Sequence, residues 1–188
     1  MARPQRVHYT WDDYVKFPDD GQRYEIIDGE LFVTAAPVFG HQFTSGELHL
    51  LLRNWSDQHG KGIVAYAPVD VVLAPDTIVQ PDLLWISDER IQEILGDRVD
   101  GIPDLVVEIL SPSTARRDRT KKSEVYARFG GREYWIVDPK DRSVEIRTNH
   151  DGKFVRHVWG TGEEPLTSTL DLQLKVVPAK LFREFKRR

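Results

Sequence analysis

The sequence predicts a fold of the α/β or α+β class, in which helices flank a mixed β-sheet. Patterns typical of strands and of helices alternate along the whole chain. The segment 105–110 is almost continuously apolar, as expected for a strand that is buried on both faces of a sheet. An Asp28-Gly29 pair between two apolar runs predicts a β-hairpin near the N-terminus.

The expected elements of the first half follow from local signals. Thr10 is a candidate N-cap with Asp13 three residues later, which predicts a short helix over 10–17. Apolar residues at helical spacing predict a long helix over 41–59, ending near Gly60. We also expect a hairpin over 24–33, strands at 63–67, 69–73 and 79–86, and a short helix capped by Ser87 and containing Ile91, Ile94 and Leu95.

The second half is organised around two buried strands that end at prolines. The strand 105–110 stops at Ser111-Pro112, and a strand over 134–137 stops at Asp138-Pro139. A helix of about 118–129 lies between them. Strands near 144–147 and 154–158 and a basic helix from about Ala179 complete the chain. We see no internal repeat or low-complexity linker, so we expect a single domain over residues 1–188.

Length and composition exclude several classes of protein. A chain of 188 residues with 40% hydrophobic residues can bury a core without staples, which excludes general disorder. The absence of cysteine excludes a disulfide scaffold, thiol catalysis and a cysteine-ligated metal, so any metal must be held by oxygen or imidazole. A net charge of -4 argues against non-specific coating of nucleic acid, but it leaves room for a local basic groove.

The N-terminus carries no apolar stretch that resembles a signal peptide. No segment of the sequence approaches the roughly 18 apolar residues that a membrane span needs. We therefore expect a cytoplasmic protein with no membrane association.

Two carboxylates fall in apolar surroundings. Glu108 lies inside the most apolar hexapeptide, on the same strand face as Val106 and Leu110. An ionised carboxylate buried there costs several kcal/mol unless a partner compensates its charge. Asp82 follows Pro81 and precedes another apolar run. Each acid has a simpler interpretation: Glu108 could form a buried ion pair with an arginine, and Asp82 could accept backbone hydrogen bonds at a strand entrance.

Taken together, the two acids suggest a metal site. Carboxylates brought together from two strands repel each other unless a hard divalent cation lies between them. Mg²⁺ is typically bound by one or two carboxylates together with waters and phosphate oxygens. The pair is therefore the outline of a site for phosphodiester hydrolysis.

The predicted helix after Glu108 adds cations beside these acids. Asp118, Lys122 and Tyr126 are spaced to share one helix face. The segment 116–128 holds six basic and two acidic residues, a local charge of +4. A basic patch near buried acids is what a phosphate-binding metal site needs. The alternatives are an exposed Asp118–Lys122 pair and a solvated helix face. The six basic residues are Arg116, Arg117, Arg119, Lys121, Lys122 and Arg128.

A long ordered set of residues resembles the Uma2 family of restriction-endonuclease-like proteins, within the PD-(D/E)XK nuclease superfamily. The resemblance covers roughly residues 10–147, which makes it far more specific than a single short motif. It runs through Tyr24-Glu25-Ile26-Ile27-Asp28-Gly29, His41, Gln80-Pro81-Asp82, Gly101 to Thr114, Asp118, Lys122, Tyr126 and Glu133 to Pro139.

The resemblance implies a restriction-endonuclease-like core with metal ligands on adjacent strands. Pro81-Asp82 would be the first half of the motif and Glu108 the acid of the second half. The pattern is incomplete at Leu110, where a lysine is expected, and Lys122 on the following helix would supply that cation instead. The implied activity is endonucleolytic hydrolysis of DNA with Mg²⁺ or Mn²⁺, in which Asp82 and Glu108 hold the metal and Lys122 stabilises developing charge.

Further residues have expected roles at the same site. Glu25 matches an acid of the family and is a candidate catalytic residue, although it could also be an exposed hairpin position. His41, near the start of the long helix, could donate to a substrate phosphate or act as a structural cap. Tyr126 could line the site or belong to the core. We expect the remaining substrate contacts from Arg116, Arg117 and Arg119.

Two other classes of function fit parts of the sequence. The missing lysine at position 110 and the net negative charge would suit a catalytically inactive nucleic-acid-binding or scaffold protein, in the form of a homodimer. Retention of Asp82, Glu108 and Lys122 opposes that interpretation. A glycosidase could use Asp82 and Glu108 as its carboxylate pair, but it should also have an aromatic sugar-binding groove.

Overall fold

A six-stranded sheet forms the centre of the structure, a computed structural model that describes residues 7–59 and 61–183. Its strands lie in the order β11-β10-β9-β8-β6-β3. β8 and β9 are parallel and the other neighbours are antiparallel, which confirms the predicted mixed sheet. The strands are β3 (Ile63–Tyr66), β6 (Leu83–Ile86), β8 (Leu105–Ile109), β9 (Glu133–Asp138), β10 (Ser143–His150) and β11 (Lys153–Thr161).

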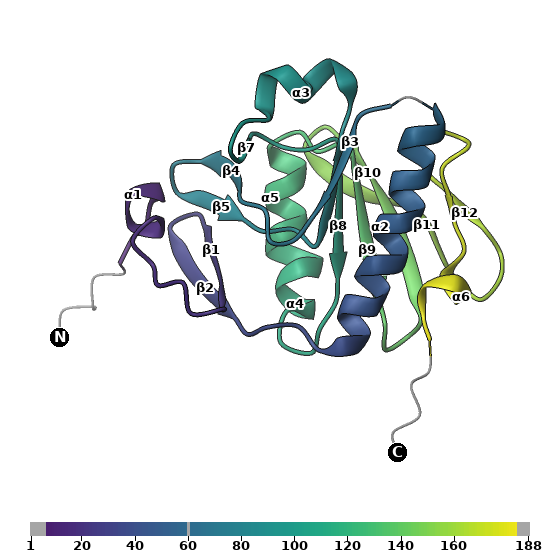
Figure 1. Cartoon of the computed structure of the whole chain (residues 1–188), viewed down its shortest axis with the longest axis horizontal. Helices are drawn as coiled ribbons and strands as arrows, with labels where there is room; N and C mark the ends of the chain where they lie inside the picture. The colour runs from purple at the N-terminus through teal and green to yellow at the C-terminus, as the bar shows by residue number, and fades with distance from the viewer. Residues whose placement is uncertain (1–6, 60, 184–188) are drawn as a thin grey trace.

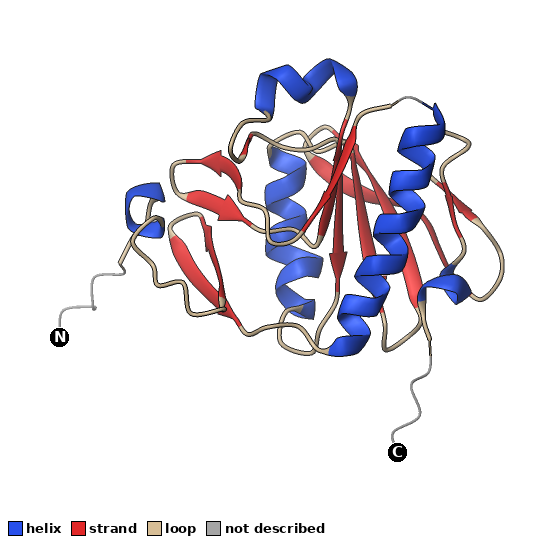
Figure 2. Ribbon diagram, viewed as in Figure 1, coloured by secondary structure: helices blue, strands red, loops and turns tan. Residues whose placement is uncertain are grey.

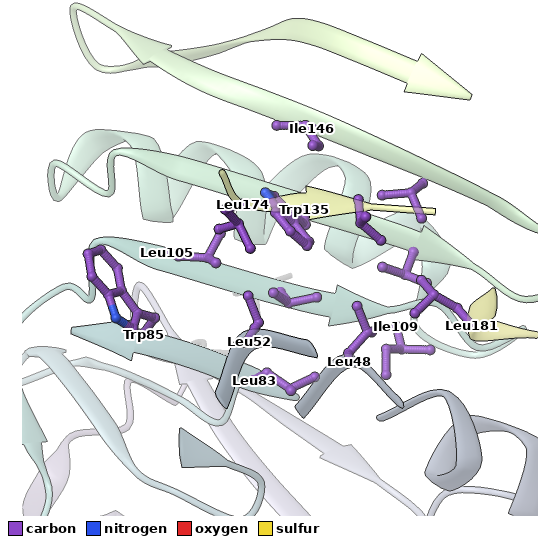
Figure 3. Packing of buried hydrophobic residues seen from close by; sticks show 14 of the residues in the cluster. Leu48, Leu52, Leu83, Trp85, Leu105, Ile109, Trp135, Ile146, Leu174 and Leu181 are labelled. Carbon is purple, nitrogen blue, oxygen red and sulfur yellow. The ribbon is translucent and has the colours of Figure 1, made fainter. Parts of the chain in front are cut away.

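Helices cover both faces of this sheet (Figure 1). On one face the helix α2 (Phe39–His59) buries Leu48 and Leu52 against Trp135 and its neighbours, as Figure 3 shows. On the other face a continuous helical segment packs Tyr126 against Val106. That segment consists of α4 (Ala115–Arg117), a π-helical turn η1 (Asp118–Lys122) and α5 (Ser123–Arg128).

A second sheet lies beside the first, in the order β2-β1-β5-β4-β7 (Figure 2). Its strands are β1 (Arg23–Ile27), β2 (Glu30–Thr34), β4 (Val71–Ala74), β5 (Thr77–Val79) and β7 (Val99–Asp100). The β1–β2 hairpin turns at Asp28 and Gly29, which have φ of 50° and 74°, as the two-residue turn requires. The hairpin prediction is thus confirmed.

Short helices and a small sheet complete the fold. The helix α1 (Trp11–Tyr14) begins after Thr10, whose backbone N–H donates to the Asp13 carboxylate over 3.0 Å. α3 (Asp88–Ile94) follows Ser87 as expected. Towards the C-terminus, β12 (Leu166–Thr167), β13 (Lys175–Val176) and α6 (Pro178–Leu181) add Leu166, Val176 and Leu181 to the core on the α2 side.

Several predicted boundaries were wrong. The segment 79–86 forms two strands in different sheets, because Pro81 has no N–H and interrupts the ladder between β5 and β6. The helix expected from 118 begins at Ala115 and contains the π-helical turn. The expected C-terminal helix is only α6 in the described residues, and positions 184–188 lie outside them. No helix in the described chain is long and apolar enough to cross a membrane.

Candidate active site

A cavity of about 890 Å³ lies between residues of both sheets, the start of α2 and the helical segment 115–128. Most of the predicted site residues line it. They come from distant positions in the sequence, and the fold alone brings them together. The predicted residues that line the cavity are Glu25, His41, Asp82, Glu108, Arg117, Arg119 and Lys122.

The register of β6 on β8 explains the position of Asp82. Leu83 pairs with Val107 in an antiparallel ladder, and extending this register by two residues would place Pro81 opposite Ile109. Proline cannot donate to a ladder, so the backbone groups of Ile109 need other partners. The Asp82 Oδ2 accepts the Ile109 N–H at 2.8 Å, and the Ile109 carbonyl lies 3.1 Å from the His41 Nε2. Asp82, the residue after the proline, therefore supplies the acceptor that the Ile109 N–H lacks in the ladder.

Asp82 is held by two further side chains. Its Oδ1 lies 2.8 Å from the Arg23 guanidinium, and its Oδ2 lies 3.1 Å from the His41 Nε2. Burial acts to raise the pKa of Asp82, but the hydrogen bond and charge of His41 and the charge of Arg23 lower it to about 2. Asp82 is therefore an ionised carboxylate at neutral pH.

Glu108 differs from Asp82 in that its pKa is raised rather than lowered. Its Oε1 accepts a hydrogen bond from the Tyr126 hydroxyl at 2.7 Å and lies 2.5 Å from the Lys122 Nζ. Burial, together with the charges of Asp118, Asp82 and Glu25, raises the pKa of Glu108 to about 8 against the attraction of Lys122. An additional cation in the cavity would favour the ionised form of this carboxylate.

Lys122 joins Glu108 to Glu25. The π-helical turn ends at Lys122 and leads its side chain into the buried space, where Nζ lies 2.8 Å from the Glu25 Oε1. Burial opposes the charge of Lys122, but Glu108, Glu25 and Asp118 raise its pKa, so the ammonium stays charged. Glu25 is buried at 3% exposure rather than lying on an exposed hairpin, and Arg117 reaches its other oxygen at 3.0 Å.

Three residues of the site carried no clear sequence signal of this role. Arg23 is the first residue of β1 and contacts Asp82. Gln80 donates its backbone N–H to the Glu25 Oε1 at 2.9 Å. Asp118, which the sequence marked by its helix spacing and by the family resemblance but without an assigned role, is buried, and burial is the main cause that raises its pKa. Polar residues at the ends of strands are common, so only the three-dimensional structure assigns the contacts of Arg23 and Gln80.

The cavity concentrates unsatisfied polar atoms. Within the described residues, five buried side-chain nitrogen or oxygen atoms have no hydrogen-bond partner, and only one of them, the Trp55 Nε1, belongs to a residue outside the cavity lining. Buried polar groups are normally paired, so a cluster of unpaired ones indicates a ligand site. The atoms on cavity residues are His41 Nδ1, Gln80 Oε1, Arg117 Nε and Asp118 Oδ1.

The donor set fits a hard divalent cation. The carboxylates of Asp82 and Glu108 come from neighbouring strands and line one cavity, and oxygen ligands of this kind suit Mg²⁺ or Mn²⁺. The described residues contain no group of three or more acidic or histidine side chains arranged closely enough to hold a metal. Glu25 is separated from this pair by Lys122, so these carboxylates would hold the ion with help from water and substrate oxygens.

The predicted basic patch is largely neutralised by pairing within the chain. Arg119 lies 2.7 Å from Asp138, Lys121 lies 2.5 Å from Glu30, and Arg128 lies 2.5 Å from Asp28. Arg116 is exposed and does not line the cavity. Of the three arginines expected to contact substrate, the structure brings Arg117 and Arg119 to the cavity and leaves Arg116 outside it.

Tyr126 is a core residue that also touches the site. Its ring is fully buried and packs edge-on against Tyr134, with the ring centroids 5.4 Å apart. Its hydroxyl nevertheless donates to Glu108. Of the two interpretations left open by the sequence, the core position is therefore the one observed, and Tyr126 does not line the cavity.

Comparisons with known proteins agree with this architecture. The model of the Uma2 family, described as "Putative restriction endonuclease", matches residues 11–178. A crystal structure of a putative nuclease belonging to DUF820 from Anabaena variabilis ATCC 29413 superposes with a TM-score of 0.77 at 18% sequence identity. The superposition covers 93% of this chain and 97% of that chain, so the two proteins share a fold. A search of curated proteins found no match.

Proposed function

The chain belongs to the Uma2 family, and we propose that it is a divalent-metal-dependent endonuclease that hydrolyses phosphodiester bonds in DNA. One observation carries the proposal: Asp82, Glu108 and Lys122 are each at most 4% exposed and share one cavity. Burying charged groups costs on the order of several kcal/mol per ion. A purely structural core gains nothing from this arrangement. A site for metal and phosphate accounts for it.

Asp82 and Glu108 would hold the cation, Mg²⁺ or Mn²⁺. When bound, such an ion lowers the pKa of a coordinated water and offsets charge on the phosphate. Asp82 is already ionised at neutral pH, whereas Glu108 must first release the proton that its raised pKa retains. Binding of the metal would therefore release a proton from this site.

The cations of the site would act on the substrate. Lys122 lies against Glu108 and stays charged, so it can stabilise negative charge that develops on the phosphate. Glu25 positions Lys122 from the opposite side of its ammonium. The guanidinium of Arg117 and the ring of His41, at the N-terminal end of α2, would provide further contacts for an anion.

Cleavage of DNA tests this proposal directly. We would incubate the folded wild-type protein with supercoiled plasmid and Mn²⁺ or Mg²⁺, beside Asp82→Asn, Glu108→Gln and a control, Arg53→Gln, whose ion pair with Asp57 lies on the surface of α2. Circular dichroism would confirm that each variant folds.

We expect nicking or linearisation by wild type and Arg53→Gln, abolished by EDTA, and a loss of roughly 10²-fold or more in the two acid variants. Cleavage that survives both acid substitutions would exclude this site as its source. A folded wild type that neither cuts DNA nor binds Mn²⁺ would favour the scaffold function instead. Because a duplex has two strands, we also propose that a homodimer makes double-strand cuts, which light scattering of the active protein would test.

A further inference from the structure

We infer that Arg23 binds a substrate phosphate, and that its contact with Asp82 keeps this carboxylate from the metal until the phosphate arrives. The inference rests on the proposed function, because it concerns the order in which metal and nucleic acid enter the same site. It assigns a role to a residue that no motif in the sequence singled out.

The carboxylate of Asp82 is fully engaged by contacts within the protein. Both of its oxygens are engaged, Oδ1 by Arg23 at 2.8 Å and Oδ2 by the Ile109 N–H at 2.8 Å and the His41 Nε2 at 3.1 Å. The Ile109 contact belongs to the backbone of β8 and is fixed by the ladder. The Arg23 contact is made by a flexible side chain, and among residues 7–59 and 61–183 it is the only hydrogen bond or ion pair to Oδ1.

Arg23 lies at the cavity and is more accessible than Asp82. Its side chain is 22% exposed, while that of Asp82 is 3% exposed, so Arg23 is the more accessible partner of the pair. Arg23 is the first residue of β1 and faces Thr34 in the hairpin register, where both line the cavity. A substrate that enters the cavity would therefore reach this arginine more readily than the acid.

The guanidinium of Arg23 has more hydrogen-bond donors than its contact with Asp82 uses. Arginine carries five N–H donors, and within the described chain the contact of Arg23 with Asp82 uses NH1. Guanidinium groups bind phosphate through two parallel hydrogen bonds, which a single monodentate contact to a carboxylate does not match. A phosphodiester can thus draw Arg23 off Asp82.

Metal and nucleic acid should therefore bind to this site cooperatively. A phosphate that engages Arg23 frees the Asp82 Oδ1 for a cation, and a cation on Asp82 in turn releases Arg23 for phosphate. Because such coupling is reciprocal, nucleic acid must raise the affinity for metal by the same factor as metal raises the affinity for nucleic acid. The contact between Arg23 and Asp82 would therefore favour metal binding in the substrate-bound protein over metal binding in the protein alone.

Calorimetric titration of Mn²⁺ tests the inference without using activity. We would titrate wild type, Arg23→Gln, Arg23→Lys, Asp82→Asn and the surface control Arg53→Gln, each checked for folding by circular dichroism. Each would be titrated alone, with a hydrolysis-resistant phosphorothioate oligonucleotide, and with an uncharged methylphosphonate oligonucleotide of the same sequence. Arg23→Lys keeps the charge and loses the fork of donors.

We expect the phosphorothioate oligonucleotide, but not the methylphosphonate one, to tighten Mn²⁺ binding at least tenfold in wild type and Arg53→Gln. Arg23→Gln should bind Mn²⁺ alone several-fold more tightly than wild type and keep less than threefold coupling, with Arg23→Lys between them. Equal affinities and equal coupling in wild type and both Arg23 variants, with binding lost in Asp82→Asn, would overturn this inference and leave the proposed function standing. No binding of Mn²⁺ to wild type under any condition would overturn both.

Discussion

The Lys122 Nζ lies 2.5 Å from the Glu108 Oε1, although the lysine belongs to the helical segment and the glutamate to the central sheet. Position 110, where the superfamily pattern expects this lysine, holds a buried leucine in the apolar cluster around α5. The ammonium therefore reaches the acid from across the site rather than along the same strand. A function that needs a cation at one point in space tolerates this change of position.

Removing this cation should destabilise the protein. In Lys122→Met the carboxylates of Glu25 and Glu108 lose their shared partner while they remain buried, and breaking such a pair typically costs about 3–5 kcal/mol. Urea denaturation at pH 9 should show a loss of this order, because both carboxylates are ionised above the Glu108 pKa of about 8. In the double variant Lys122→Met/Glu108→Gln the loss should be clearly smaller than the sum of the single effects. Additive losses would show that the two side chains are not coupled.

The stability of the protein should depend on pH through Glu108. Its pKa of about 8 in the folded chain exceeds the ordinary value of 4.5, so between these values the native state binds a proton that the unfolded chain lacks. The free energy of unfolding therefore falls as pH rises through this window. Glu108→Gln cannot ionise, so its stability relative to wild type should increase between pH 5.5 and pH 8, by on the order of 1–3 kcal/mol. Parallel stability curves for the two proteins would contradict the raised pKa.

The hydroxyl of Tyr126 should matter more for the metal than for the fold. Tyr126→Phe keeps the buried ring and removes only the donor to Glu108, which costs about 1 kcal/mol of stability. Because that hydrogen bond orients the carboxylate, we expect Mn²⁺ affinity, measured by calorimetry with the oligonucleotide present, to fall several-fold. An unchanged affinity would assign Tyr126 to the core alone.

Glu133 offers a contrast, since it is a fully buried acid that lies outside the cavity lining. Its carboxylate accepts hydrogen bonds from the Trp135 Nε1, the Ser168 hydroxyl, and the backbone N–H and hydroxyl of Thr169. We expect Glu133→Gln to lower stability by about 1–3 kcal/mol, because hydrogen bonds to a charged acceptor are lost. Its affinity for Mn²⁺ should stay at the wild-type value, and a loss of affinity in the folded variant would contradict a purely structural role.

Much of the fold could be predicted because local signals and tertiary packing agree. The Asp28-Gly29 turn and the apolar strand at 105–110 appear where the sequence places them. The prediction was wrong at Pro81, where the apolar residues on either side of Gln80-Pro81-Asp82 belong to strands of two different sheets. The short strands β7, β12 and β13 were not predicted, since two-residue strands depend on tertiary pairing rather than on periodicity.

The site could be predicted only in part. Asp82 and Glu108 were recognisable because charged residues in apolar surroundings need compensation, and Lys122 was recognisable from its helix spacing and the family resemblance. The structure places all three around one cavity. Arg23 and Gln80 could not be found in this way, because polar residues at strand ends carry no such signal. The basic run 116–128 was a weaker guide, since pairing within the chain neutralises most of its charge, and sequence does not reveal which partners each side chain meets.

Anomalous diffraction from Mn²⁺ in crystals of the wild-type protein, grown with a hydrolysis-resistant oligonucleotide, tests the central claim most directly. Our account predicts a peak within about 2.0–2.5 Å of carboxylate oxygens of both Asp82 and Glu108, and its loss in Glu108→Gln crystals. A well-ordered cavity with oligonucleotide bound and no peak between these two side chains, or a peak held by other residues, would contradict it.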